Sequence, residues 1–186
     1  MTNTTTWVID PMHSEVLFKI KHLVISTVTG SFRKFEGKAT TENEGFENAK
    51  VSLTIDVKSI DTNQSMRDTH LQDGDFFAAD LYPTITFQST SFEKTSGINY
   101  KMVGNLTLRG VTKPVQLNVE YGGSENDGHG NIKHGFEVTG IINRKEFGMT
   151  FNKLTDAGGL ALGEDIKLIA NIQVAKLVEA EAEIKA

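Results

Sequence analysis

The stretch AKVSLTIDV, residues Ala49–Val57, decides the fold class of this chain. Its first, third, fifth, seventh and ninth residues are apolar, and lysine, serine, threonine and aspartate stand between them. Alternation with a period of two places the two sets of side chains on opposite faces of a β-strand. One apolar and one polar face is typical of an antiparallel strand that covers a core and meets water on its other side.

The same alternation recurs along most of the chain. The other alternating segments are Glu15–His22, Tyr100–Arg109, Val115–Tyr121, Phe136–Ile142 and Ile166–Val174, with weaker ones at Phe32–Thr40 and Thr84–Phe92. Turn signals separate them at Gly97, at Gly110 before Val111–Pro114, and in a loop predicted over Gly122–Asn131. About eight antiparallel strands follow, and closing them into a barrel removes the two exposed sheet edges. We therefore predict a single all-β barrel, with a β-sandwich as the alternative.

The segment Asp61–Phe77, DTNQSMRDTHLQDGDFF, breaks the alternation. Charged residues crowd there beside a leucine and two phenylalanines, so the segment cannot be a regular half-buried strand. We predict a short helical segment near residues 63–77, with Asn63 or Ser65 as its N-cap.

Arg67 and His70 are the polar side chains of that segment with a candidate function. Their spacing of three residues brings them to the same side of a helix. The guanidinium fork of Arg67 suits a diphosphate or a carboxylate. The same fork can instead pair with a neighbouring aspartate, at 68, 73 or 75, and lock the segment. His22 is in register with Phe18 and Ile20, so its side chain is expected to point inward, as a buried structural imidazole or as a contact for a polar ligand group.

Composition excludes several classes of protein and site. The chain has 186 residues, 38% hydrophobic and 23% charged, which is typical of one globular domain. Its net charge of −5 argues against a nucleic-acid partner. It contains 0 cysteines, which rules out disulfides, thiolate catalysis and cysteine zinc sites. The five histidines have no metal-ligand spacing, and no apolar run reaches the ~20 residues of a membrane span.

The N-terminal residues MTNTTTWVIDP lack a basic region followed by an apolar stretch. This predicts a cytoplasmic protein, or a periplasmic one if a leader was removed.

A set of short motifs, taken in order, resembles the YceI-like family. The motifs are Trp7-Val8-Ile9-Asp10, His13-Ser14, Gly30-Ser31-Phe32, Ser59-Ile60-Asp61-Thr62, Arg67-Asp68-Thr69-His70-Leu71, Asp75-Phe76-Phe77, Tyr82-Pro83, Gly104–Pro114 and Arg144-Lys145-Glu146-Phe147-Gly148. Each motif alone is weak, but the ordered set is specific and covers almost the whole chain. The resemblance implies one lipocalin-like barrel over residues 7–177, followed by a C-terminal tail, 178–186, that is a short helix or frayed.

The resemblance also implies a function. YceI-like proteins bind polyisoprenoid chains, including isoprenoid quinones and prenyl phosphates, in an apolar pore, and the family is linked to stress responses. We expect a non-enzymatic carrier of an isoprenoid lipid, with no catalytic residue, metal or cofactor, and with a homodimer as an open option. The expected apolar liners are Phe18, Ile20, Phe32, Phe76, Phe77, Phe87, Leu106, Phe136 and Ile142. The expected contacts for the polar head are His22, Arg67 and His70.

Two alternatives stay open from the sequence. One is an enzyme acting on an isoprenoid head group, with His70 as a base or Arg67 as an anion clamp. The other is an interaction module with a filled core, because strand periodicity does not tell a hollow barrel from a solid one. Arg144 and Glu146 are expected to form an ion pair at the end of the barrel or a surface pair of little energetic consequence.

Overall fold

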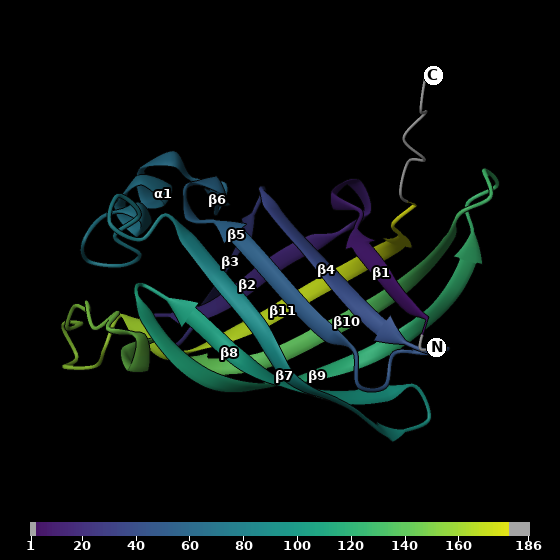
Figure 1. Cartoon of the computed structure of the whole chain (residues 1–186). Coiled ribbons are helices and arrows are strands. Elements are labelled where there is room, and N and C mark those ends of the chain that lie inside the picture. The colour runs from purple at the N-terminus through teal and green to yellow at the C-terminus, as the bar shows by residue number, and fades with distance from the viewer. Residues whose placement is uncertain (1–2, 179–186) are drawn as a thin grey trace.

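A computed structural model describes residues 3–178 of the chain (Figure 1). The strands are β1 Thr4–Ile9, β2 Glu15–His22, β3 Ser26–Phe32, β4 Phe35–Glu42, β5 Lys50–Asp56, β6 Ile60–Asp61, β7 Thr84–Ser96, β8 Asn99–Leu108, β9 Val111–Asn126, β10 Ile132–Asn143 and β11 Leu162–Lys176. The helical elements are α1 Ser65–Gln72 and three short 3-10 turns, η1 Pro11–His13, η2 Val57–Ser59 and η3 Arg144–Phe147. Apart from Val178, the predicted C-terminal tail lies outside the described residues.

The strands close into an antiparallel barrel. Hydrogen-bonded neighbours follow one another in the order β1-β4-β5-β7-β8-β9-β10-β11, and β11 pairs back onto β1 through Trp7–Lys176 and Ile9–Val174. The remaining strands, β2, β3 and β6, extend the sheet on the other part of the same β11 edge. Closure confirms the predicted barrel and excludes the sandwich.

Three neighbouring long strands of this barrel are each interrupted once, so that each of them is counted as two labelled strands. β1 and β2 run one after the other along β11, with the break at Asp10–Ser14. β4 and β3 form the next interrupted strand, since β4 pairs with β1 and β3 pairs with β2. β5 and β6 form the third, which is interrupted by η2 and pairs with β4 and β3. Counted as continuous strands, these three pairs and the five other strands give the predicted eight. Ser14 replaces part of the lost backbone pairing, because its Oγ accepts a hydrogen bond of 2.9 Å from the backbone N–H of Gln173.

Several local predictions were wrong in their bounds. The weak strand predicted over Phe32–Thr40 corresponds to β4, which begins only at Phe35, because Phe32 is the last residue of β3. The loop predicted over Gly122–Asn131 begins only after Asn126. β9 continues through the two glycines because a bulge there lets Tyr121 pair with Phe136 and Gly123 with Gly135.

The turn predicted at Gly110, before Val111–Pro114, is confirmed, and Arg109 forms it together with Gly110. Arg109 and Gly110 both adopt a left-handed conformation, with φ 50° and 71°, as a two-residue hairpin turn requires. The short helix is confirmed, but Gln64 caps it, since the Oε1 atom of Gln64 accepts a hydrogen bond of 2.6 Å from the backbone N–H of Arg67.

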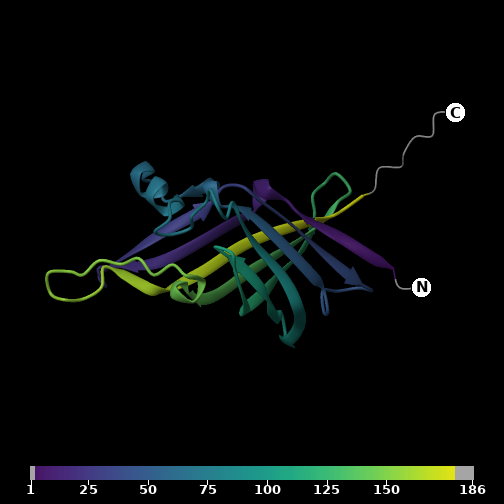
Figure 2. The same cartoon turned by 60° about the vertical axis from the view of Figure 1, so that its left-hand side comes forward.

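The two ends of the barrel differ. Helix α1 and the loop that follows it lie at one end, on the left of Figure 1, together with η3 and the long loop before β11. Figure 2 shows this long loop projecting beyond the strands at the same end. The β9–β10 hairpin and β1 lie at the opposite end. Among the described residues, no helix has the length and apolar character needed to span a membrane.

Candidate ligand-binding cavity

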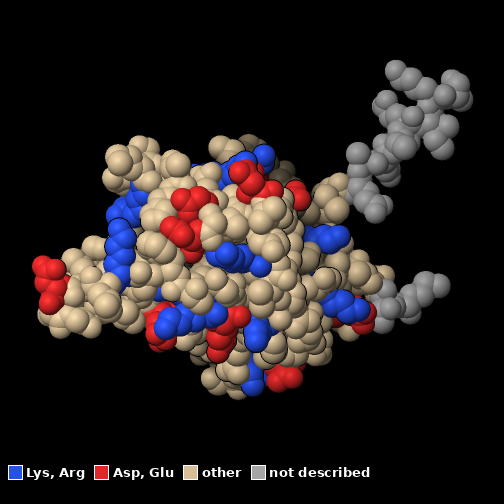
Figure 3. All heavy atoms as spheres, turned by 90° about the vertical axis from the view of Figure 1, so that its left-hand side faces the viewer, with Lys and Arg blue, Asp and Glu red and all other residues tan. Residues whose placement is uncertain are grey.

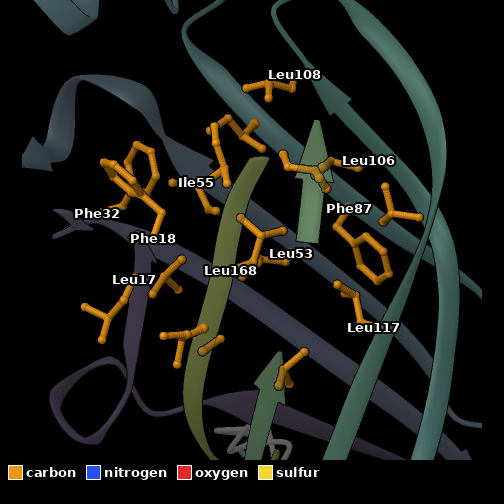
Figure 4. Close-up of a pocket in the computed structure, with 18 of the residues that line it drawn as sticks. Leu17, Phe18, Phe32, Leu53, Ile55, Phe87, Leu106, Leu108, Leu117 and Leu168 are labelled. Carbon is orange, nitrogen blue, oxygen red and sulfur yellow. The ribbon is translucent and has the colours of Figure 1, made fainter. Parts of the chain in front are cut away.

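The barrel is hollow. It contains a cavity of about 470 Å³, and aliphatic and aromatic side chains from most of the strands line it. Figure 4 shows Phe18, Phe87, Leu106 and Leu117 extending from different strands toward this common space. A hollow interior argues against the filled-core alternative.

Glycines on the inner face help to shape the cavity. Gly30 lies opposite Phe18 on the neighbouring strand, and the Phe18 ring covers the position that a Cβ of residue 30 would take. The Phe87 ring covers Gly104 from a diagonal position on the neighbouring strand, since a Cβ there would lie 2.7 Å from Cε2 of that ring. The absence of a side chain at these positions lets both rings lie against the wall instead of filling the interior.

All of the apolar residues singled out in the sequence line this cavity. They are Phe18, Ile20, Phe32, Phe76, Phe77, Phe87, Leu106, Phe136 and Ile142. Most are buried as well, with Phe18, Phe32, Phe87 and Ile142 each between 7% and 8% exposed. Their contact with a ligand stays a prediction, whereas their position on the cavity wall is a feature of the structure.

An aromatic cluster lies at the β1 end of the barrel. Trp7, Phe46, Tyr121, His134 and Phe136 pack edge to face or tilted, with ring centroids 4.6 Å apart for Trp7–His134 and 4.8 Å apart for Phe46–Phe136. The Tyr121 hydroxyl is hydrogen-bonded to Nδ1 of His134 at 2.9 Å. Burial lowers the pKa of His134, because a charged imidazole would lose its hydration there. Phe46 and Phe136 also line the cavity, so this cluster forms the wall at that end.

Arg67 and His70 both reach the cavity from α1, as their spacing predicts. The guanidinium of Arg67 is partly engaged, because Nε donates to Oγ1 of Thr62 and Nη2 donates to the carbonyl of Thr62, both at 2.7 Å. Thr62 in turn donates to Asp68 through its backbone N–H and its hydroxyl. Arg67 therefore locks the segment through Thr62, and not through a direct pair with an aspartate.

His70 contacts both a carboxylate and aromatic rings. Its Nε2 lies 2.9 Å from Oδ2 of Asp75, and its ring packs edge to face on Phe76 and Phe151, with centroids 5.0 and 5.3 Å away. A carboxylate oxygen of Asp73 is within 4.8 Å of these ligand atoms, so the three residues have the spacing of a metal site. The side chain of Asp73 accepts a hydrogen bond from the backbone N–H of Asp75. This bond stabilises the turn after α1, and the turn by itself explains why the three side chains lie close together.

His22, the third polar candidate, also lines the cavity at this end of the barrel, where it pairs with Leu162 at the start of β11.

Arg144 is the residue that the sequence analysis misplaced. It is only 1% exposed, it lines the cavity, and no ion pair joins it to Glu146 in the described part of the chain. Nε donates to the carbonyl of Gly163 at 2.8 Å, and Nη1 donates to those of Met149 and Phe151 at 2.7 and 2.8 Å. A signal for this position exists in the sequence, because Arg144 continues the even-numbered inner face of β10 after Val138, Gly140 and Ile142.

The chain is similar to proteins of one known family. A family model described as the YceI-like domain matches residues 7–174. A UPF0312 protein of Staphylococcus aureus (strain bovine RF122 / ET3-1) is 39% identical over 174 residues, which covers 93% of this chain and 97% of the relative.

Solved structures share the fold. The Campylobacter jejuni YceI protein superimposes with a TM-score of 0.72 at 37% identity, covering 87% of this chain and 91% of that one. A polyisoprenoid binding domain from Saccharophagus degradans superimposes with a TM-score of 0.63 at 16% identity, covering 92% of this chain and 98% of that one. The family model covers nearly the whole barrel, and the chain therefore belongs to the YceI-like family.

Proposed function

We propose that this protein binds the hydrocarbon chain of a long amphiphilic isoprenoid lipid inside its barrel, for storage or transport and without chemical conversion. The observation that carries the proposal is the cavity of about 470 Å³ with its nearly continuous apolar lining. Removing a hydrocarbon chain from water stabilises the complex by ~0.8 kcal/mol per methylene. The affinity of such a cavity for a lipid should therefore rise with the length of hydrocarbon chain that it buries.

The isoprenoid class is supported by the family and by the shape of the wall. The Saccharophagus degradans domain of the same fold is named for polyisoprenoid binding, and we extend this ligand class to the present chain. Rings such as Phe18, Phe32 and Phe87 line the cavity beside branched aliphatic residues. Methyl-branched chains suit an irregular wall of this kind, since each methyl group can occupy a gap between rings.

Most of the polar lining residues lie at the α1 end, with Lys38 and Ser52 on β4 and β5 as the others, and this gives the ligand a direction. His22, Arg67, His70, Arg144 and Lys153 line the cavity there, whereas the opposite wall is the aromatic cluster. The tail would lie toward the aromatic cluster, and the polar head would lie near α1 and η3. Compartment, oligomeric state and any link to stress stay predictions.

A titration with neutral prenols tests this proposal. Delipidated protein would be titrated with geraniol, farnesol and geranylgeraniol, and with 1-hexadecanol as a linear-chain comparison. Each further isoprene unit that the cavity accepts should improve Kd by at least ~10-fold, because five more carbons are buried at a gain well above the 1.4 kcal/mol of a tenfold change. Equal weak binding of all three prenols would refute the proposal. Preference for 1-hexadecanol would refute the isoprenoid class.

A further inference from the structure

Arg144 carries a buried charge whose hydrogen bonds are incomplete. A guanidinium has five N–H donors, and three of them, on Nε and Nη1, point to backbone carbonyls. Nη2, with the other two donors, is buried and has no hydrogen-bond partner among the described residues. Buried polar groups are hydrogen-bonded in the great majority of cases, so an unpartnered one asks for an explanation.

The charge of Arg144 also has no ion-pair partner of its own among the described residues. Its three acceptors are neutral carbonyls, and Glu164, the acid that acts on it electrostatically, is engaged by Lys145 at 2.6 Å. Burial lowers the pKa of Arg144, which reflects the cost of keeping a cation in this environment. A buried charge without a counter-charge is expensive, and an anion brought next to it would recover that cost.

The cavity wall offers cations and no anions. Arg67, Arg144 and Lys153 line it at the α1 end, together with His22 and His70, and none of the described lining residues is Asp or Glu. The outside of the molecule at this end is different, because acidic and basic side chains are interspersed over it (Figure 3). The positive character is therefore a property of the cavity and not of the whole face.

These groups lie close together in the fold. His70 packs on Phe151, and the carbonyl of Phe151 accepts a hydrogen bond from Arg144. Arg67 is exposed and gives two of its N–H groups to Thr62, so Arg144 is the guanidinium in this group whose unpartnered outer nitrogen is buried.

We propose that Nη2 of Arg144 binds an anionic oxygen of the ligand head, so that the barrel selects a prenyl chain ending in a phosphate or carboxylate over a neutral prenol or quinone. This inference rests on the proposed function, because it needs a prenyl chain in the cavity. It places the head beside η3, deeper than the fork of Arg67. A role in structure alone, as a clamp on the carbonyls of the loop before β11, would predict no preference for charge.

The test compares ligands that share one tail. Kd would be measured for geranylgeraniol, geranylgeranyl phosphate and geranylgeranoic acid with the wild-type protein at fixed salt. A charge-assisted hydrogen bond to a buried guanidinium should favour the anions by at least ~10-fold, and the two anions separate a phosphate preference from a general one. Equal affinity for the alcohol and both anions would overturn this inference and leave the proposed function intact. Failure of all three ligands to bind would overturn the proposed function itself.

Variants assign the preference to Arg144. In Arg144→Gln, the ratio of anion to alcohol affinity should fall to near one. If Arg144→Gln does not fold because the hydrogen bonds to the three carbonyls are lost, Arg144→Lys is the second variant. It keeps the positive charge and should retain part of the preference for the anionic ligands. The matched control is Arg109→Gln, since Arg109 also donates to a carbonyl, that of Phe76, at this end without lining the cavity. An unchanged ratio in folded Arg144→Gln, or an equal loss in Arg109→Gln, would contradict the assignment.

Discussion

Gly30→Ala tests whether the interior is ligand space that the wall keeps open. An ideal Cβ on residue 30 would lie 2.5 Å from Cε1 of Phe18 and closer still to Cζ, so the ring must retreat by about 1 Å or more to reach normal contact. All three of the nearest atoms belong to this one ring, and the cavity is the open space beside it. The ring is therefore expected to turn inward.

Two magnitudes follow from this displacement. Overpacking of a wall position costs ~1–3 kcal/mol in the free energy of unfolding. A ring that takes the place of one or two chain carbons removes ~0.8 kcal/mol of binding for each, which weakens the affinity for geranylgeraniol by about 4- to 15-fold. Shorter prenols should be affected less, because they need not reach the narrowed section.

The assays are denaturant unfolding and titration of the prenol series, with Gly135→Ala as the matched control. No atom of the described residues lies within 4 Å of a Cβ built on Gly135, so this variant should be neutral or more stable by up to ~1 kcal/mol, with unchanged binding. If folded Gly30→Ala keeps the wild-type affinity at every chain length, Phe18 does not border the ligand, and the assignment of the cavity is wrong.

Three further outcomes are expected. Leu106→Gln places an amide in the wall of the cavity and should weaken geranylgeraniol binding by at least ~10-fold in calorimetry. Asn105→Gln, at an exposed position of the same strand, should leave the binding unchanged. Equal effects of the two variants would contradict the assignment of Leu106 to the cavity wall. Because burial lowers the pKa of His134, the unfolded chain binds its proton more tightly, so stability should fall as the pH drops below 6.5 and level off once the folded imidazole also titrates. His134→Gln should flatten this slope in urea unfolding at several pH values, and an unchanged slope would assign it to other groups. Replacing Leu23-Val24 by Asn-Gly should raise the free energy of unfolding by ~1–2 kcal/mol, since both residues have a left-handed backbone, with φ 51° and 65°; an unchanged urea midpoint would show that the turn is not strained.

The barrel itself could be predicted from period-two alternation, because in a strand with one solvent-exposed face the apolar residues of the sequence are the inward-facing ones. Ala49–Val57 gave β5 almost to the residue, and Glu15–His22 gave β2. The three interrupted strands could not be predicted, since each break depends on the neighbouring strand. The break at Ser14, for example, is completed by a hydrogen bond with Gln173, far along the chain.

Periodicity could not predict the cavity, and its signal for the buried Arg144 is outweighed by the polar neighbours of this residue. Alternation tells which residues point inward but not whether they meet, and the space depends on rings lying over glycines such as Gly30. Arg144 is surrounded in sequence by asparagine, lysine and glutamate, which is typical of a surface turn. It is buried because the loop before β11 folds back and presents the carbonyls of Met149 and Phe151 to it.

Native mass spectrometry of the purified protein, beside solvent extraction of the same sample, tests the central claim most directly. A hollow barrel that binds an isoprenoid should carry a stoichiometric adduct, and the extract should contain a species with the mass of a prenyl lipid. A protein that shows only its own mass, and that takes up no geranylgeraniol or geranylgeranyl phosphate when either is supplied in excess, would contradict the account.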